Sequence, residues 1–130
     1  MTQNEYILTL CNDNPNAVII GSLGTICYDL DRIEHPNKIL IRGAMGSVIG
    51  IGLGYALNTH KQVIVLIGEG SFLMKMGSLA TILKYQPQNL RVIIINNSSF
   101  ASCGGQQNNF YEVSRLLKQV SNFEIFSPTL

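Results

Sequence analysis

Short apolar runs alternate along the chain with longer segments in which apolar residues recur at helical spacing. The runs are rich in valine and isoleucine, and most of them end at glycine or asparagine. They show no alternation of apolar and polar positions, which indicates strands buried on both faces, as in parallel sheets. We therefore predict buried strands over residues 17–24, 37–43, 62–68 and 90–97, and a last strand over residues 123–126.

The segments between these runs predict helices. In one of them Gly46, Gly50 and Gly54 recur at every fourth position, which gives that helix one thin face. Strands that alternate with helices predict an α/β fold, a doubly wound and mostly parallel sheet flanked by helices. The helices are expected over residues 25–33, 44–58, 71–85 and 110–120, with a polar loop over residues 98–108.

Length and composition narrow the possible partners. A chain of 130 residues suits one compact core, so we expect a single domain over residues 1–130. The formal net charge of +1 argues against nucleic acid or an anionic membrane as a partner. The apolar stretch over residues 43–57 is also too short for a membrane span, which needs about 20 residues. The charged fraction of only 13% suggests instead that part of the surface meets another protein.

The cysteines and histidines predict no site of their own. Cys11, Cys27 and Cys103 are widely spaced and fit neither a disulfide framework nor a zinc site. We interpret them as reduced thiols of a cytoplasmic protein, and the first residues lack the pattern of a signal peptide. His35 and His60 are expected at the surface, and neither has a neighbour that would suggest a nucleophile–base pair.

The stretch "IGEGS" places a lone carboxylate, Glu69, between two glycines, where a buried strand ends and a helix is expected to begin at Ser71. A glycine turn that opens a helix presents backbone N–H groups and the positive end of the helix dipole, which together form a phosphate cradle. A carboxylate there would repel a bare phosphate, but it makes sense if Mg²⁺ lies between them. Asn96 and Asn97 could add an oxygen ligand, because they follow the next strand and ligands bind at the carboxyl ends of parallel strands.

Each of these motifs alone also has an ordinary structural interpretation. Glu69 could be a solvated turn residue, and Asn96-Asn97 is typical of a strand-to-loop turn. The glycines at 50, 52 and 54 are not the dinucleotide-binding fingerprint, because they lie within a helix and have the wrong spacing. The functional prediction therefore depends on the combination of motifs.

Taken together, the stretches "GAMGSVIGIGLGYALN", "VIVLIGEGSFLMKMGSLATI" and "VIIINNSSFASCGGQ" resemble the diphosphate-binding domain of thiamine diphosphate enzymes. The resemblance covers about residues 18–106 and is closest to the sulfopyruvate and phosphonopyruvate decarboxylases. Asn97 follows Glu69 by 28 positions, which matches the spacing between the metal-binding acid and the asparagine of that family.

The resemblance implies a role for each matching position. Gly43 would accept a hydrogen bond from the aminopyrimidine of the cofactor through its carbonyl. Met45 would be the apolar wedge that holds the cofactor bent, with a core methionine as the alternative. Gly70 and Ser71 would hold diphosphate oxygens. The implied cofactor-binding set is Gly43, Ala44, Met45, Gly68, Gly70, Ser71, Asn97 and Ser99.

The metal ligands implied by the resemblance come from two strand ends. Glu69 and Asn97 would bind Mg²⁺ through their side chains, and Ser99 would bind it through its carbonyl. The stretch "CGGQ" resembles a loop near the substrate in the decarboxylases, and a mobile glycine loop is the alternative. The implied substrate-loop residues are Gly104, Gly105 and Gln106.

Glu69 departs from the family pattern, which has aspartate at this position. The extra methylene moves the carboxylate outward by roughly 1.3 to 1.5 Å, and Mg²⁺ prefers near-octahedral geometry. Metal binding would then need a shifted backbone or an intervening water, or it has been weakened or lost.

The chain also has no room for the pyrimidine-binding domain, which in this family carries the glutamate that activates the cofactor. The resemblance implies that a separate pyrimidine-binding subunit supplies it, as in two-subunit sulfopyruvate decarboxylases, and that this chain has no catalytic residue of its own. Glu5, Glu34, Glu112 and Glu124 lie outside any motif that could replace that glutamate. The domain is further expected to be short at its C-terminal end, with a sheet edge that is exposed or covered by a partner.

The implied activity is decarboxylation of a small 2-oxoacid with thiamine diphosphate and Mg²⁺, in which the cofactor accepts electrons as CO₂ leaves. The same cofactor would also serve carboligation, as in acetolactate synthases. A third interpretation is a degenerate binding partner that has lost metal binding. In that case the cofactor would not stabilise the protein, even beside its partner chain.

Overall fold

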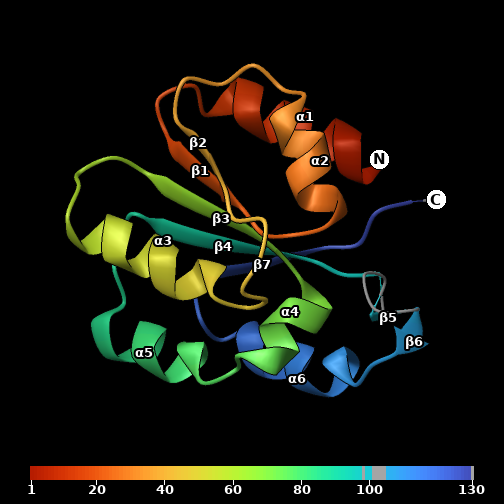
Figure 1. Cartoon of the computed structure of the whole chain (residues 1–130). Coiled ribbons are helices and arrows are strands. Elements are labelled where there is room, and N and C mark those ends of the chain that lie inside the picture. Colours follow the sequence, from red (N-terminus) through yellow and green to blue (C-terminus); the bar gives the residue numbers. More distant parts are fainter. Residues whose placement is uncertain (98, 101–104, 130) are drawn as a thin grey trace.

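The computed structural model describes residues 1–97, 99–100 and 105–129 of the chain. Its centre is a parallel sheet of five strands in the order β2-β1-β3-β4-β7 (Figure 1). The winding direction reverses between β1 and β3, a position at which open α/β sheets bind ligands. The doubly wound α/β prediction is therefore confirmed. The strands are β1 (Val18–Gly21), β2 (Lys38–Leu40), β3 (Val63–Gly68), β4 (Leu90–Ile95) and β7 (Phe123–Phe126).

Helices cover both faces of this sheet (Figure 1). One face carries α1 (Gln3–Asp13) and α2 (Thr25–Asp31). The other carries α3 (Val48–Leu57), α5 (Ser78–Tyr85) and α6 (Phe110–Leu117), while the short α4 (Glu69–Met74) follows β3 directly. No helix in the described ranges combines the length and the apolar character that a membrane crossing requires.

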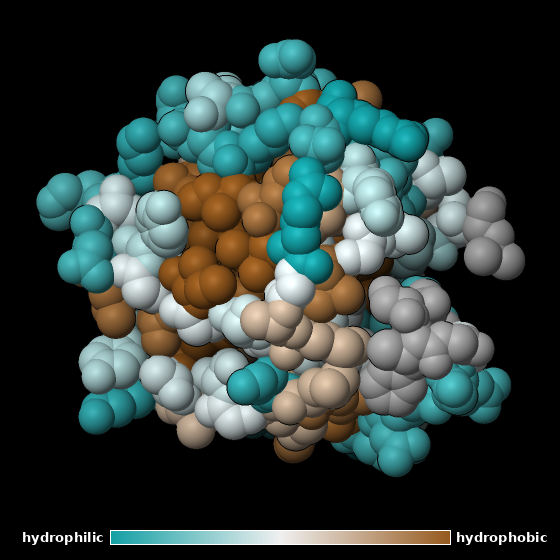
Figure 2. Space-filling view, viewed as in Figure 1, coloured by the Kyte–Doolittle hydropathy of each residue, from teal (hydrophilic) through white to brown (hydrophobic). Residues whose placement is uncertain are grey.

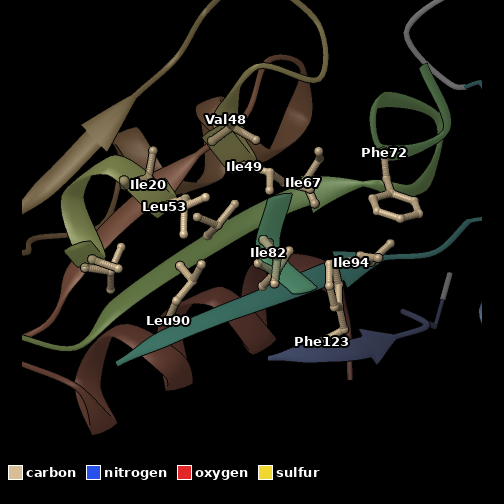
Figure 3. Close-up of a cluster of buried hydrophobic side chains, with 14 of the residues drawn as sticks. Ile20, Val48, Ile49, Leu53, Ile67, Phe72, Ile82, Leu90, Ile94 and Phe123 are labelled. Atoms are coloured by element: carbon tan, nitrogen blue, oxygen red, sulfur yellow. The ribbon is translucent and has the colours of Figure 1, made fainter. Parts of the chain in front are cut away.

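Successive strand residues point to opposite faces and so build two hydrophobic clusters. Ile20, Ile67 and Ile94 belong to the cluster that packs against α3 and α5 (Figure 3). Ile19 and Ile93 belong to the cluster beneath α1 and α2. Burial of the strands on both faces explains why their sequences show no polar alternation.

Several predicted boundaries were wrong. The predicted helix over residues 44–58 begins only at Val48, because Ala44 and Gly46 have φ angles of +52° and +88°, which no α-helix accommodates. The predicted helix over residues 71–85 is two helices, α4 and α5, separated at Lys75, whose φ of −130° is not helical. The predicted strand over residues 37–43 is reduced to β2.

One helix and two short strands differ from the sequence prediction. α1 was not predicted, although Thr2 and Glu5 form a capping box in which each side chain accepts a hydrogen bond from the backbone N–H of the other. The predicted loop over residues 98–108 contains two paired strands, β5 (Ser99–Phe100) and β6 (Gln106–Gln107).

His35 is buried and not at the surface, because its ring joins two loops. Its Nδ1 accepts a hydrogen bond from the Asn37 N–H at 3.1 Å. Its Nε2 lies 3.0 Å from the Asn14 carbonyl oxygen, so that Nε2 carries the donated proton.

Candidate functional site

The three sequence motifs that follow β2, β3 and β4 meet at the carboxyl edge of the sheet. Because Gly68 lies opposite Ile95 in the register of β3 and β4, the residues that follow each strand are neighbours. Glu69 follows β3 directly, and Asn97 lies two residues beyond β4. The Asn97 N–H donates a hydrogen bond to the Glu69 carboxylate at 2.6 Å. The two motifs therefore lie side by side as expected, and the contact between them is made by the backbone N–H of Asn97.

Glu69 is buried, with only 1% of its surface exposed, and it is not the solvated turn residue of the alternative interpretation. Its position in the chain also differs from the prediction, because α4 begins at Glu69 and not at Ser71. Gly68 has extended backbone angles and caps the helix. The carboxylate therefore lies in the first turn of α4, where the helix dipole favours negative charge.

The first turn of α4 is also where the predicted diphosphate-binding residues lie. The first N–H groups of an α-helix have no intrahelical acceptor, and this applies to Gly70 and Ser71. Both residues are buried. The helix is anchored by Phe72, which is fully buried and packs edge-to-face against Phe110 and Phe123 at centroid distances of 6.2 and 5.8 Å. This packing holds the donor groups in place at the sheet edge.

The "GAMG" turn packs directly on α4. A Cβ atom at Gly46 would lie 2.8 Å from the Ser71 carbonyl oxygen and would collide with the Lys75 side chain, so only glycine fits there. The turn is closed by a hydrogen bond from the Ser47 N–H to the Ala44 carbonyl at 2.9 Å. Gly43 and Ala44 are exposed, and Met45 is half-buried. The turn thus presents its backbone outward beside the first turn of α4.

Cys27 helps to hold the strand that leads into this turn. Its thiol lies 3.6 Å from the carbonyl oxygens of both Gly21 and Ile41. Gly21 is the last residue of β1, and Ile41 follows the neighbouring strand β2. Burial raises the pKa of the Cys27 thiol, although Arg42 acts in the opposite direction. The thiol therefore stays protonated at neutral pH and can donate to these carbonyls.

Unpaired polar atoms and open glycines at this edge fit a phosphorylated cofactor. The hydroxyls of Ser22, which follows β1, and Ser47, which precedes α3, are buried and find no hydrogen-bond partner among the described residues. Buried hydroxyls without partners are rare unless a ligand or water satisfies them. At Gly43 and Gly68, a Cβ atom would find no described atom within 4 Å. Neither serine was predicted, because nothing in the local sequence marks a hydroxyl that the fold leaves without a partner among the described residues.

The proposed metal and substrate residues are only partly described. Ser99 lies in β5, opposite Gln107 in β6. Gly105 and Gln106 are exposed, and Gly104 lies outside the described residues. In the described part of the chain, no three His, Cys, Asp or Glu side chains gather into a metal-binding group. A cation here would thus need the mixed acid, amide and backbone ligands that the sequence predicted, and their roles stay predictions.

Comparison with known proteins concerns the family and the fold of the chain. Residues 20–127 match the family model of the thiamine pyrophosphate enzyme, C-terminal TPP binding domain. The match continues past residue 106, where the resemblance seen in the sequence ends, to residue 127. The fold is similar to a solved structure from Mycobacterium smegmatis, assigned as a thiamin diphosphate-dependent enzyme, with a TM-score of 0.68 and 19% identity. That similarity covers 100% of this chain and 32% of the other, and it concerns the fold alone.

Curated relatives share more of the sequence. The sulfopyruvate decarboxylase subunit beta of Methanocaldococcus jannaschii is 37% identical over 74% of this chain and 52% of its own length. The phosphonopyruvate decarboxylase of Streptomyces hygroscopicus is 40% identical over 72% of this chain and 23% of its own length. The sulfopyruvate decarboxylase of Methanosarcina acetivorans is 35% identical over 82% of this chain and 28% of its own length. The chain thus spans about a quarter to a half of the length of these relatives.

Proposed function

The chain belongs to the thiamine pyrophosphate enzymes, and on this basis we propose that it is the diphosphate-binding subunit of a thiamine diphosphate- and Mg²⁺-dependent 2-oxoacid decarboxylase. The relatives named sulfopyruvate and phosphonopyruvate decarboxylases support this reaction. Their names indicate a small 2-oxoacid with a second, strongly anionic group as the class of substrate. Among the described residues, Cys11 and Cys27 are free thiols. Free thiols are typical of reducing compartments, and we therefore place the protein in the cytoplasm.

The observation that carries the proposal is the buried carboxylate of Glu69, which accepts a hydrogen bond from the Asn97 N–H and lies in the first turn of α4. The N-terminus of a helix favours the binding of a phosphate. In this proposal Glu69, Asn97 and the Ser99 carbonyl hold Mg²⁺, and Gly70 and Ser71 hold diphosphate oxygens. Bound thiamine diphosphate supplies the electron sink for loss of CO₂. This chain binds and orients the diphosphate end and excludes water from it.

The pyrimidine end of the cofactor needs a second chain in this proposal. The Gly43 carbonyl would accept a hydrogen bond from the aminopyrimidine, with Ala44, Met45 and Gly68 beside it. The activating carboxylate would come from a pyrimidine-binding subunit. Support comes from the relatives named "subunit beta", a term that implies another subunit. It also comes from the longer sulfopyruvate decarboxylase of Methanosarcina acetivorans, of which this chain covers 28%.

The test is isothermal titration of thiamine diphosphate with Mg²⁺ into the chain co-expressed with the product of its neighbouring gene. We expect binding in the wild type, loss of binding in Glu69→Ala, and retained binding in Glu69→Asp, which restores the acid of the family. The same complexes are assayed for CO₂ release from sulfopyruvate and phosphonopyruvate. No binding in the wild type, together with binding restored by Glu69→Asp, would mean that the site has decayed and would overturn the proposed activity.

A further inference from the structure

Two exposed cations lie beside the cofactor turn, which we define as residues 43–46. Arg42 directly precedes this turn, and its side chain is 58% exposed. Lys75 directly follows α4, is also exposed, and packs on the turn through the first part of its side chain. A Cβ atom at Gly46 would collide with the Cβ and Cγ atoms of Lys75. A cation is therefore attached next to each end of the turn.

Neither cation is neutralised within the described residues. The Arg42 guanidinium lies 3.7 Å from the Asp31 carboxylate, and both side chains are more than half exposed. A long, exposed ion pair of this kind contributes little to stability, so Arg42 readily exchanges Asp31 for another anion. The Lys75 ammonium forms no ion pair or hydrogen bond with any described residue. Lys38 differs, because its ammonium donates to three carbonyl oxygens at and after the end of α2 and is fixed there.

The helix that follows the turn supplies no charge of its own. α3 has the sequence "VIGIGLGYAL", which contains no charged residue. Figure 2 shows a hydrophobic area over this helix. Charges beside an apolar, poorly solvated surface act more strongly than charges surrounded by water. Arg42 and Lys75 therefore keep most of their attraction for an anion that approaches the turn.

The proposed contents of the site would by themselves repel an anionic substrate. The Glu69 carboxylate is negative, and so is the diphosphate that Gly70 and Ser71 are proposed to hold. Mg²⁺ offsets only part of this charge, because a diphosphate and a carboxylate together carry more negative charge than one Mg²⁺ ion neutralises. A 2-oxoacid with a second anionic group brings further negative charge to the same edge of the sheet. Such a substrate therefore needs cations of the protein close to the cofactor turn.

We propose that Arg42 and Lys75 bind the second anionic group of the substrate, a sulfonate or a phosphonate, an inference that rests on the proposed function. In the proposed binding mode the cofactor lies over the turn, with its aminopyrimidine at the Gly43 carbonyl and its bend supported by Met45. The substrate reacts beside these residues, and its second anionic group is then held between the two cations.

The two cations contribute differently to this binding. Arg42 presents a planar fork of N–H donors that fits two oxygens of a sulfonate or a phosphonate. Lys75 adds a compact charge, and the first part of its side chain is held against Gly46. Pyruvate has no second anionic group and gains no affinity from either residue. Arg42 and Lys75 are therefore specificity-determining residues for the proposed reaction.

The test uses charge-removing variants of the chain co-expressed with the product of its neighbouring gene. Arg42→Gln and Lys75→Gln remove the two cations, and glutamine at position 75 keeps the Cβ and Cγ atoms that pack on Gly46. The matched controls are Arg115→Gln and Lys84→Gln, which remove exposed cations from the last turns of α6 and α5. We expect each site variant to raise KM for sulfopyruvate and phosphonopyruvate about tenfold or more, as the loss of a hydrogen bond to a charged group predicts. The value of kcat should change by no more than about twofold, because the lost contact binds ground state and transition state equally.

A second readout does not depend on turnover. The analogues 3-sulfopropanoate and 3-phosphonopropanoate keep both anionic groups but lack the keto carbon, so they bind without reacting. They are titrated calorimetrically into the complex loaded with thiamine diphosphate and Mg²⁺. We expect affinity to fall about tenfold in Arg42→Gln and Lys75→Gln and to stay unchanged in the two controls. Arg42→Lys should retain part of the affinity, because it keeps the charge and loses the planar fork.

The remaining outcomes separate this inference from the proposed function. Site variants that bind thiamine diphosphate normally and keep the wild-type KM and analogue affinity would overturn the inference and leave the proposed function in place. Variants that lose the cofactor itself would also overturn it, because the cations would then serve the diphosphate. A response confined to one of the two substrates would support the inference and identify the anion. Failure of the wild-type complex to bind the cofactor would overturn both.

Discussion

The fold favours the neutral forms of the partly buried Tyr6 and of the buried Cys11 and Cys27. Burial raises the pKa of the Tyr6 hydroxyl, the Glu124 carboxylate raises it further, and Arg91 opposes the shift. Burial likewise raises the pKa of the Cys11 thiol. In the unfolded chain these groups would ionise near their ordinary values of 9.0 for cysteine and 10.0 for tyrosine. The folded and unfolded states therefore differ in bound protons above about pH 9.

This difference predicts a loss of stability in alkaline solution. A raised folded-state pKa contributes stability that is fully present below the unfolded pKa and is lost as the pH rises through the folded pKa. We expect the free energy of unfolding to fall from about pH 9 upward, measured by urea denaturation at a series of pH values. The Tyr6→Phe variant, which removes one of these groups, should show a smaller fall above about pH 10. Identical profiles for the two proteins would contradict the role of Tyr6.

Glu69 shows how far single residues could be predicted from the sequence. Its placement beside Asn97 followed from glycines and an acid at one strand end and asparagines at the next. Its burial and its place within α4 did not follow, because they depend on where Phe72 anchors the helix. Ser22 and Ser47 were missed for a related reason. An unsatisfied hydroxyl is a property of its three-dimensional surroundings, and the local sequence does not reveal it.

At the scale of elements, the edge strand β7 is tied to β4 by an ion pair. Arg91 donates to both carboxylate oxygens of Glu124, at 2.7 and 2.9 Å. We expect a double-mutant cycle with Arg91→Ala and Glu124→Ala to give a coupling of about 0.5–1 kcal/mol, since both side chains are partly exposed. Unfolding in 1 M salt should reduce this coupling. A coupling near zero at low salt would show that the pair does not secure β7.

Two glycines of α3 offer a matched pair for testing how the helix packs. Gly52→Ala should lower the free energy of unfolding by about 1–3 kcal/mol, because the added methyl group collides with Val65 in the core. Gly54→Ala should raise it by about 0.5–1 kcal/mol, because the methyl group enters open space and helix propensity improves. Urea unfolding of both variants measures the difference. A destabilising Gly54→Ala would mean that this glycine serves the fold of the chain itself.

Helices and strands were predictable where a pattern of apolar residues specified them. They were not predictable where the backbone geometry of a few residues decided the structure. The five strands of the central sheet were found because each contains a short apolar run, and α6 was found from its helical spacing of apolar residues. α1 was missed, although the Thr2–Glu5 capping box was a start signal present in the sequence. The break between α4 and α5 was missed because apolar spacing continues across it, and only the backbone at Lys75 shows the interruption.

At the scale of the whole molecule, the gathering of the site is a consequence of topology. Parallel strands bring their carboxyl ends to one edge, so motifs separated by many residues in sequence become neighbours once the sheet forms. The sequence could therefore predict which motifs meet. It could not predict that β1 would lie between β2 and β3, because strand order depends on how the helices pack on the two faces.

The two hydrophobic clusters predict that the chain unfolds as one unit, which tests the proposal of a single domain over residues 1–130. Both clusters draw alternate residues from the same strands, such as Val65 and Leu66 of β3. Losing α1 and α2 would therefore expose one whole face of the strands that hold the other cluster in place. We expect one calorimetric transition with an unfolding enthalpy of roughly 90 kcal/mol near 60 °C and equal van't Hoff and calorimetric values. Two separable transitions, or a van't Hoff value well below the calorimetric one, would mean that the α1–α2 layer unfolds independently.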